Sequence, residues 1–134
     1  MIRVSAGFDS GAIELRAASA GGLVTPPEDG APVVIALGIR RDATADPQCD
    51  FRQWFHFRVQ GAAGRRVAIE LDNAGRSTYP DGWRDYRACA SYDRRDWFRV
   101  PTRFDGERLT IEHAVAHDSV WYAYFEPYSW ERHL

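Results

Sequence analysis

Short segments of alternating apolar and polar residues follow one another along this chain, and none repeats its apolar residues at the 3.6-residue spacing of a long helix. The clearest segments come in two pairs. One covers residues 53–71 around the small residues 61–64, and the other covers residues 97–113 around Asp105-Gly106. We interpret each pair as a β-hairpin, and Asp105-Gly106 is the dipeptide typical of a type I′ turn.

Alternation within the first pair assigns its residues to the two faces of a sheet. One face carries polar or charged side chains: His56, Arg58, Arg66 and Glu70. The other face is apolar, and we predict that it belongs to the core. Its members are Phe55, Phe57, Val59, Val67, Ile69 and Leu71.

Further strands are predicted at residues 12–17, 32–39, 86–91 and 119–125, each bounded by Gly, Pro, Asp or Asn. Many short strands without helical crossovers favour an all-β fold, an antiparallel β-sandwich of two sheets with little helix. A small barrel is the alternative. Loops are predicted at 21–31 and 78–83, where Pro, Gly and Asp are concentrated.

Length and charge bound the function. A chain of 134 residues has the size of one domain, and a net charge of -2 gives no electrostatic reason to expect nucleic acid or an anionic membrane as a partner. No signal peptide and no apolar run of about 18 residues is present, so we expect a cytoplasmic protein. All 17 basic residues are arginine, which excludes lysine chemistry.

Residues with catalytic potential are few. No nucleophile elbow or phosphate loop occurs, and Cys49 and Cys89 are expected to be reduced and buried. His113 and His117 have a spacing that suits zinc on a helix, but a strand end removes that geometry and no third ligand lies nearby. We therefore prefer two satisfied or surface histidines, interpret His56 as a hydrogen-bonding residue of a sheet surface, and predict no cofactor in this chain.

Carboxylates and arginines alternate through residues 81–105. One interpretation is an ion-paired, solvated sheet face. The other is a rim of arginines that faces an acidic peptide or a neighbouring domain, since guanidinium groups bind carboxylates in a two-pronged geometry. The sequence leaves both open.

Aromatic residues crowd the last part of the chain, at six positions between 121 and 130. So much aromatic area must be packed internally or covered by a partner. We expect an exit strand here, and an exposed one would also favour self-association.

Seven short motifs occur in an order that resembles the N-terminal domain of cytosolic-type M14 metallocarboxypeptidases. They are Phe8-Asp-Ser-Gly11, Trp54-Phe-His-Phe-Arg-Val59, Tyr79-Pro-Asp-Gly-Trp83, Ser91-Tyr-Asp93, Trp97-Phe-Arg-Val100, Phe104-Asp-Gly106 and Tyr124-Phe-Glu-Pro-Tyr-Ser129. In that family a β-sandwich precedes a zinc carboxypeptidase domain. The sequence departs from the family pattern at His56 and Trp130.

The resemblance implies a non-catalytic module: a β-sandwich over residues 1–127, with residues 128–134 beginning the connection to a catalytic domain. Its partner would be the carboxypeptidase domain of the same polypeptide, which would hold the zinc ligands and the glutamate base, and this module would shape access to it. No segment of this chain matches those ligands. The residues expected to contact the catalytic domain are Trp83 at the tip of its turn and Glu126, Tyr128, Trp130 and Arg132 at the exit, because aromatic residues and arginine dominate interface energies.

The alternative function is a stand-alone carbohydrate- or peptide-binding sandwich. It would use Trp54, Trp83 and Trp97 as a flat stacking platform with polar neighbours. A position of these rings in the core or at an edge would count against it.

Overall fold

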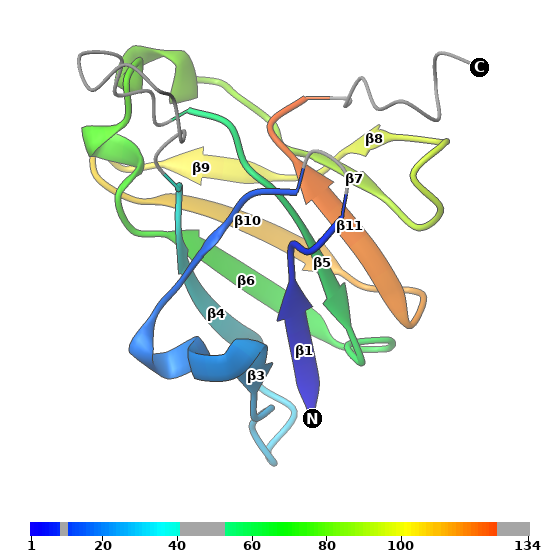
Figure 1. Cartoon of the computed structure of the whole chain (residues 1–134). Coiled ribbons are helices and arrows are strands. Elements are labelled where there is room, and N and C mark those ends of the chain that lie inside the picture. Colours follow the sequence, from blue (N-terminus) through cyan, green and yellow to red (C-terminus); the bar gives the residue numbers. More distant parts are fainter. Residues whose placement is uncertain (9–10, 41–52, 126–134) are drawn as a thin grey trace.

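The computed structural model of the chain describes residues 1–8, 11–40 and 53–125, and in these it forms two β-sheets packed face to face (Figure 1). The predicted β-sandwich with little helix is confirmed. Sheet A has the spatial order β3 (Leu23–Val24), β1 (Ile2–Ser5), β5 (His56–Gln60), β11 (Ser119–Ala123), β7 (Cys89–Ser91) and β8 (Phe98–Arg99).

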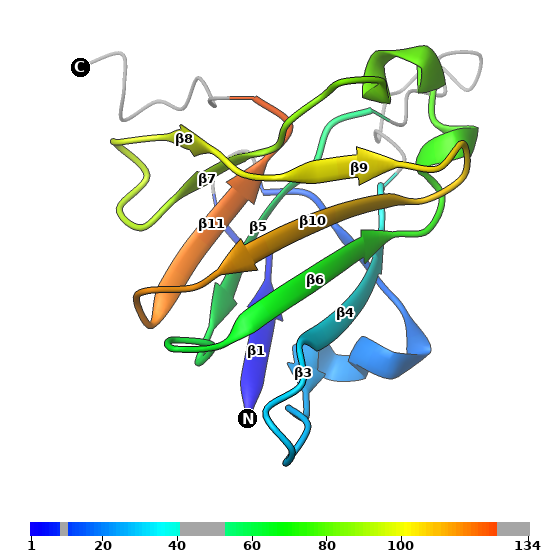
Figure 2. The ribbon, with the colours of Figure 1, turned by 180° about the vertical axis from the view of Figure 1, so that it is seen from behind.

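Sheet B lies behind sheet A in Figure 1 and faces the viewer in Figure 2. Its order is β2 (Glu14–Leu15), β4 (Val33–Gly38), β6 (Arg66–Leu71), β10 (Leu109–Ala114) and β9 (Thr102–Phe104). Neighbouring strands are antiparallel except β4 and β6, which are parallel. Three short 3-10 helices complete the described elements: η1 (Ala17–Gly22), η2 (Ala74–Arg76) and η3 (Pro80–Trp83).

The predicted hairpin over residues 53–71 is wrong, although its apolar face is confirmed. β5 belongs to sheet A and β6 to sheet B, so the chain arches from one sheet to the other. The arch is held by its neighbour: the Gly61 amide donates to the Asp118 carbonyl at 2.9 Å and the Gly64 amide to that of Val115 at 2.9 Å. The six apolar residues predicted to belong to the core are all buried, those of β5 and the adjoining Phe55 from sheet A and those of β6 from sheet B.

The second predicted pair is a hairpin only in part. β9 and β10 pair antiparallel as expected, but Trp97 to Val100 leads into β8 of the other sheet, and the chain changes sheets at Pro101. The connecting turn is also longer than the type I′ turn that we predict. Asp105 keeps a negative φ, and its carboxylate accepts the amides of Glu107 at 2.9 Å and Arg108 at 2.7 Å.

The remaining strand predictions are confirmed with shorter limits. Residues 32–39 contain β4, 86–91 contain β7 and 119–125 contain β11, whereas 12–17 contribute only the two residues of β2. Of the predicted loops, 21–31 also includes β3, and 78–83 winds into η3 with Pro80 at its first position.

Within the described residues the aromatic end of the chain is partly internal and partly exposed, with Phe125 49% exposed. Tyr122 is fully buried, and the ring of Tyr124 lies 5.1 Å from that of Trp83. β11 pairs with β5 on one side and β7 on the other, so it is a central strand and has no free edge. Pairing along β11 is therefore not open to a second copy, and self-association through the residues that follow β11 stays a prediction.

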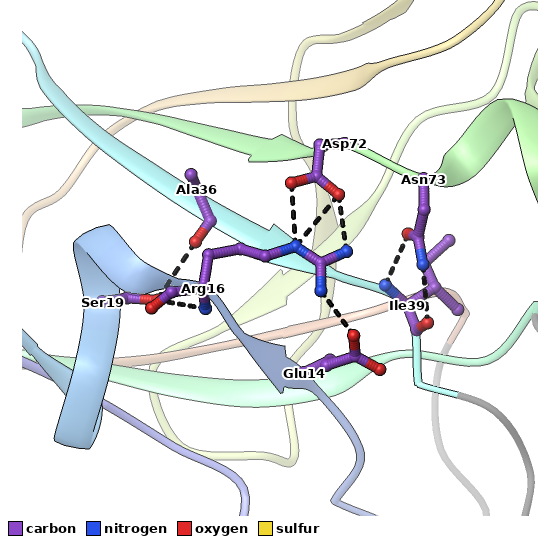
Figure 3. A network of polar contacts seen from close by, with 7 residues as sticks. All are labelled: Glu14, Arg16, Ser19, Ala36, Ile39, Asp72 and Asn73. Carbon is purple, nitrogen blue, oxygen red and sulfur yellow. Dashed lines mark hydrogen bonds and ion pairs between the residues drawn. The ribbon is translucent and has the colours of Figure 1, made fainter.

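A polar network joins the start of the chain to sheet B, as Figure 3 shows. The Arg16 guanidinium donates to both oxygens of Asp72, at 2.6 and 2.8 Å, and it also pairs with Glu14. The pKa of Asp72 is lowered by these bonds. Gly38 makes room for the network, because a Cβ atom there would lie 2.1 Å from an Arg16 nitrogen.

Candidate functional site

The outer face of sheet A carries side chains unlike those of an ordinary solvated sheet. Register sets this face: Val4, Val59 and Val120 point into the core, so the residues beside them point outward. One row across four strands reads Ser5, Arg58, Trp121 and Ser91. The flanking rows add Arg3, Gln60 and Ser119 on one side, and His56, Ala123, Cys89 and Arg99 on the other.

His56 lies in the middle of an aromatic cluster on this face, where the alternation pattern placed it. Its ring is 4.7 Å from Phe8, 5.8 Å from Trp97 and 6.0 Å from Trp54, each in an edge-to-face arrangement. The side chain is 2% exposed. The cluster therefore packs as a small apolar layer outside the sandwich core.

Trp121 is in contact with two cations. The guanidinium carbon of Arg58 lies 5.8 Å from its ring centroid and that of Arg94 lies 5.9 Å away. Arg94 also lies 5.4 Å from the ring of Phe8. Each such contact stabilises by about 0.5–1 kcal/mol at a partly exposed site. We call Phe8, Trp54, His56, Arg58, Arg94, Trp97 and Trp121 the arginine–aromatic face.

The turn between β7 and β8 holds Arg94 in place. Arg94 has φ of 65°, in the left-handed region that non-glycine residues rarely adopt. The Ser91 hydroxyl accepts its amide at 2.8 Å, and one Asp93 oxygen accepts the amides of Arg95 and Asp96 at 2.8 and 2.9 Å. These backbone bonds lower the pKa of Asp93. The turn thus uses its carboxylate to fix the backbone that presents the guanidinium.

Three buried polar atoms on this side of sheet A have no hydrogen-bond partner in the described part of the chain. They are Ser5 Oγ, Arg58 Nε and Trp97 Nε1. Ser5 and Arg58 are direct cross-strand neighbours. An unpaired buried donor costs about 1–3 kcal/mol, so the hydrogen bonding of this face is incomplete.

The outer face of sheet B has the opposite character. Arg103 pairs with Glu112 at 2.8 Å and Arg108 pairs with Glu70 at 3.0 Å, all partly or largely exposed. Such pairs are typical of a solvated surface. Of the interleaved charges at 81–105, Arg103 therefore fits the solvated interpretation, whereas Arg94 belongs to the arginine–aromatic face.

Two polar depressions lie away from this face. One, of about 490 Å³, is lined by Glu14, Arg16, Asp72, Asn73 and Arg76. The other, of about 420 Å³, is lined by Asp72, Gly75, Arg76, Gly106 and Glu107. Because Arg16 already binds both oxygens of Asp72, the depressions lack an available base or metal ligand at their shared carboxylate.

His113 does not have the geometry of a zinc ligand. Its Nδ1 lies 2.7 Å from the Tyr122 hydroxyl and its Nε2 lies 3.1 Å from that of Tyr92, so both ring nitrogens are engaged. The ring of His117 stacks edge-on against Tyr92 at 4.6 Å. Among the described residues, no group of three His, Cys, Asp or Glu side chains is arranged to hold a metal.

The partial burial of His113 predicts a loss of stability in mild acid. Burial lowers the pKa of this imidazole, so the folded state binds fewer protons than the unfolded state. The contribution is complete above about pH 6.5 and is lost as pH falls through the lower, folded pKa. Urea denaturation at pH 7.5 and 5.5 measures this loss. We expect His113→Gln to reduce the difference in unfolding free energy between the two pH values and His117→Gln to leave that difference unchanged. An equal pH dependence in the two variants would contradict the assignment to His113.

The residues expected to contact a second domain are only partly within the described chain. Trp83 lies in the core, 1% exposed, rather than at a turn tip, so its contact with another domain stays a prediction. Glu126, Tyr128, Trp130 and Arg132 lie outside the described residues. Arg58 and Arg94 were missed as site residues, although alternation already placed Arg58 beside His56 on the outer face.

The tryptophan platform that the alternative function would need is not formed. Trp83 is buried in the core, while Trp54 and Trp97 stand at 82° and 67° to the ring of His56. Stacking of a sugar needs flat, accessible rings, and this arrangement does not offer the three together. The geometry counts against the carbohydrate-binding alternative.

Comparison with known proteins decides the family. Residues 4–125 match the family model described as the cytosolic carboxypeptidase N-terminal domain. The chain belongs to this family. Similar solved structures are metallocarboxypeptidases, and together with the family model they confirm the resemblance that the seven motifs indicated.

Three similar proteins are each much longer than this chain. A metallo-carboxypeptidase of Burkholderia cenocepacia is 45% identical with a TM-score of 0.83. The match covers 99% of this chain and 31% of that protein. A Pseudomonas aeruginosa metallo-carboxypeptidase, solved with (2-guanidinoethylmercapto)succinic acid, is 40% identical with a TM-score of 0.80. That match covers 98% of this chain and 31% of the Pseudomonas protein. An uncharacterized protein of Zymomonas mobilis is 44% identical over 88 residues, 66% of this chain and 23% of its own.

The chain thus spans about a third or less of the length of these relatives. In its described residues no helix has the length and apolar character of a membrane span. Cys89 is a buried thiol, as expected, and Cys49 lies outside the described residues.

Proposed function

We propose that this chain is the non-catalytic N-terminal module of a zinc carboxypeptidase that removes C-terminal residues from peptides. The carrying observation is the Burkholderia cenocepacia enzyme, which matches 99% of this chain with only 31% of its own length. In such an enzyme zinc activates a water molecule and a glutamate serves as base. The module would contribute neither.

The role of the module is to dock on the catalytic domain of the same polypeptide, stabilise it and wall one side of the entrance to its active site. The sandwich ends near residue 127, and residues 128–134 begin the connection. The proposed contacts are Glu126 at the end of the sandwich, Tyr128, Trp130 and Arg132 in the connection, and Trp83 near the turn at 79–83. The family name supports a cytoplasmic location.

The test begins with the reading frame beyond Leu134. We expect a segment that contains His-x-x-Glu and a later histidine, and a polypeptide that releases C-terminal residues from peptides until a chelator removes its metal. A stop codon directly after Leu134 would remove the enzyme from the proposal. A complete polypeptide that binds no zinc would do the same.

A further inference from the structure

We infer that the outer face of sheet A, and not that of sheet B, is the docking surface of this domain, and that it receives a carboxylate-bearing surface of the catalytic domain. This inference rests on the proposed function, because it names the face through which the proposed docking occurs. It concerns the arginine–aromatic face together with Arg3 and Arg99 of the same sheet.

The charge of the two sheets supports this choice. At the outward positions of the described strands of sheet A, arginine occurs at 3, 58 and 99 and neither Asp nor Glu occurs. On sheet B, each glutamate of β6 and β10 has an arginine beside it, Arg108 for Glu70 and Arg103 for Glu112. Sheet B therefore supplies carboxylates to two of its arginines, with Arg66 left over, whereas the outward positions of the described strands of sheet A supply none.

The aromatic content points the same way. Interfaces are rich in Trp, Tyr, Phe and Arg, and exposed faces of sheets are not. Three of the five tryptophans of the sequence, Trp54, Trp97 and Trp121, stand on the outer side of sheet A. The side chain of Phe125, 49% exposed, lies 5.1 Å from Trp54 and extends the layer.

Incomplete hydrogen bonding identifies the chemistry of the partner. Arg58 Nε and Trp97 Nε1 are N–H donors, and both are buried without an acceptor in the described chain. Rotation of the Arg58 side chain away from the sheet would let its guanidinium meet a carboxylate and remove that unpaired donor. A surface that supplies carboxylate or carbonyl oxygens fits both donors, and a purely apolar surface fits neither.

Arginine footprinting tests the inference in folded proteins without any substitution. A dicarbonyl reagent modifies accessible guanidinium groups, and peptide mass spectrometry reports each position in the 134-residue chain and in the polypeptide of the complete reading frame. Arg3 and Arg99 are exposed on sheet A, and Arg66 and Arg103 are exposed on sheet B. We expect the first two to react roughly 5-fold or more slowly in the complete polypeptide and the second two to react at unchanged rates.

A matched pair of substitutions in the complete polypeptide sharpens the test. Arg58→Gln should restore reactivity to Arg3 and Arg99, whereas Arg103→Gln should not, and thermal unfolding of the isolated variants checks that both fold. Protection of Arg66 and Arg103 instead would overturn the face assignment and leave the proposed docking intact. No protection on either sheet would overturn the docking itself. Protection of Arg3 and Arg99 in the 134-residue chain as its concentration rises would make a second copy the occupant and overturn the inference.

Discussion

Replacing Trp83 by alanine should reduce the free energy of unfolding by about 3–5 kcal/mol, the range for removing a large aromatic side chain from a core. The indole contacts Tyr86 at 5.2 Å and Tyr124 at 5.1 Å between ring centroids. Its Nε1 donates to the Ala74 carbonyl at 3.0 Å and to the Ser77 hydroxyl at 2.8 Å. The loss is large because the substitution removes the ring contacts and both hydrogen bonds at once. It is also a large share of the total stability of a domain, which is typically about 5–15 kcal/mol.

A milder substitution keeps this prediction testable if the alanine variant does not fold. Trp83→Phe retains most of the ring area but leaves two buried acceptors without their donor, so we expect a loss of about 1–3 kcal/mol in urea denaturation. Trp97→Phe is the control. It removes an indole N–H that has no partner in the described chain, and its cost should stay below about 1 kcal/mol. Similar losses in the two phenylalanine variants would contradict the role of the Trp83 hydrogen bonds.

Replacing Asn73 by alanine should cost about 2–4 kcal/mol, because it leaves two buried backbone groups unpaired. The Asn73 side-chain amide pairs with the backbone of Ile39 as a neighbouring strand would. Its Oδ1 accepts the Ile39 amide at 2.8 Å and its Nδ2 donates to the Ile39 carbonyl at 3.0 Å (Figure 3). Asn73 is 4% exposed and Ile39 is fully buried, so water does not replace these bonds.

The chain contains a matched control for this experiment. Gln53 makes the same two bonds to the backbone of Tyr79, at 2.8 and 2.9 Å, but at an exposed position. Gln53→Ala should therefore cost less than about 1 kcal/mol in the same urea denaturation, because water takes over both partners. Equal losses for Asn73→Ala and Gln53→Ala would show that burial of the bonded groups does not set the cost.

The sequence pattern predicts which side of each strand faces the core, but not which strand lies next to it. Alternation at 55–59 and 67–71 identifies the buried residues correctly, because an arch and a hairpin bury the same positions. The choice between them depends on long-range partners, such as the distant Asp118 carbonyl that the Gly61 amide binds. A local pattern contains no information about that partner.

The turn residues show a similar limit. Asp105-Gly106 indicates a turn, which is confirmed, yet the Asp105 carboxylate binds two following amides and selects a longer loop. Pro80-Asp81-Gly82 also indicates a turn, and Trp83 after it is expected at a tip. Instead η3 directs the indole inward to Ala74 and Ser77, two residues that no local rule connects with it.

The candidate site was partly accessible from sequence for the same reasons. The place of His56 and Arg58 on an outer face follows from period-two alternation. The presence of Arg94 beside them does not, because it depends on a left-handed residue in the turn after β7. Contacts such as that of Arg94 with Phe8 join segments more than eighty positions apart, beyond the reach of any periodicity.

The central place of β11 in sheet A sets the order in which the domain can be completed during synthesis. The ribosome makes β3, β1 and β5 early and β7 and β8 later, but the strand that joins these two halves spans residues 119–123. Until it emerges, β5 and β7 each present an unpaired edge on a nascent chain, a condition that favours aggregation and chaperone binding. A polypeptide cut before Ser119 would therefore lose the strand that joins the two halves of sheet A, not a dispensable terminal segment.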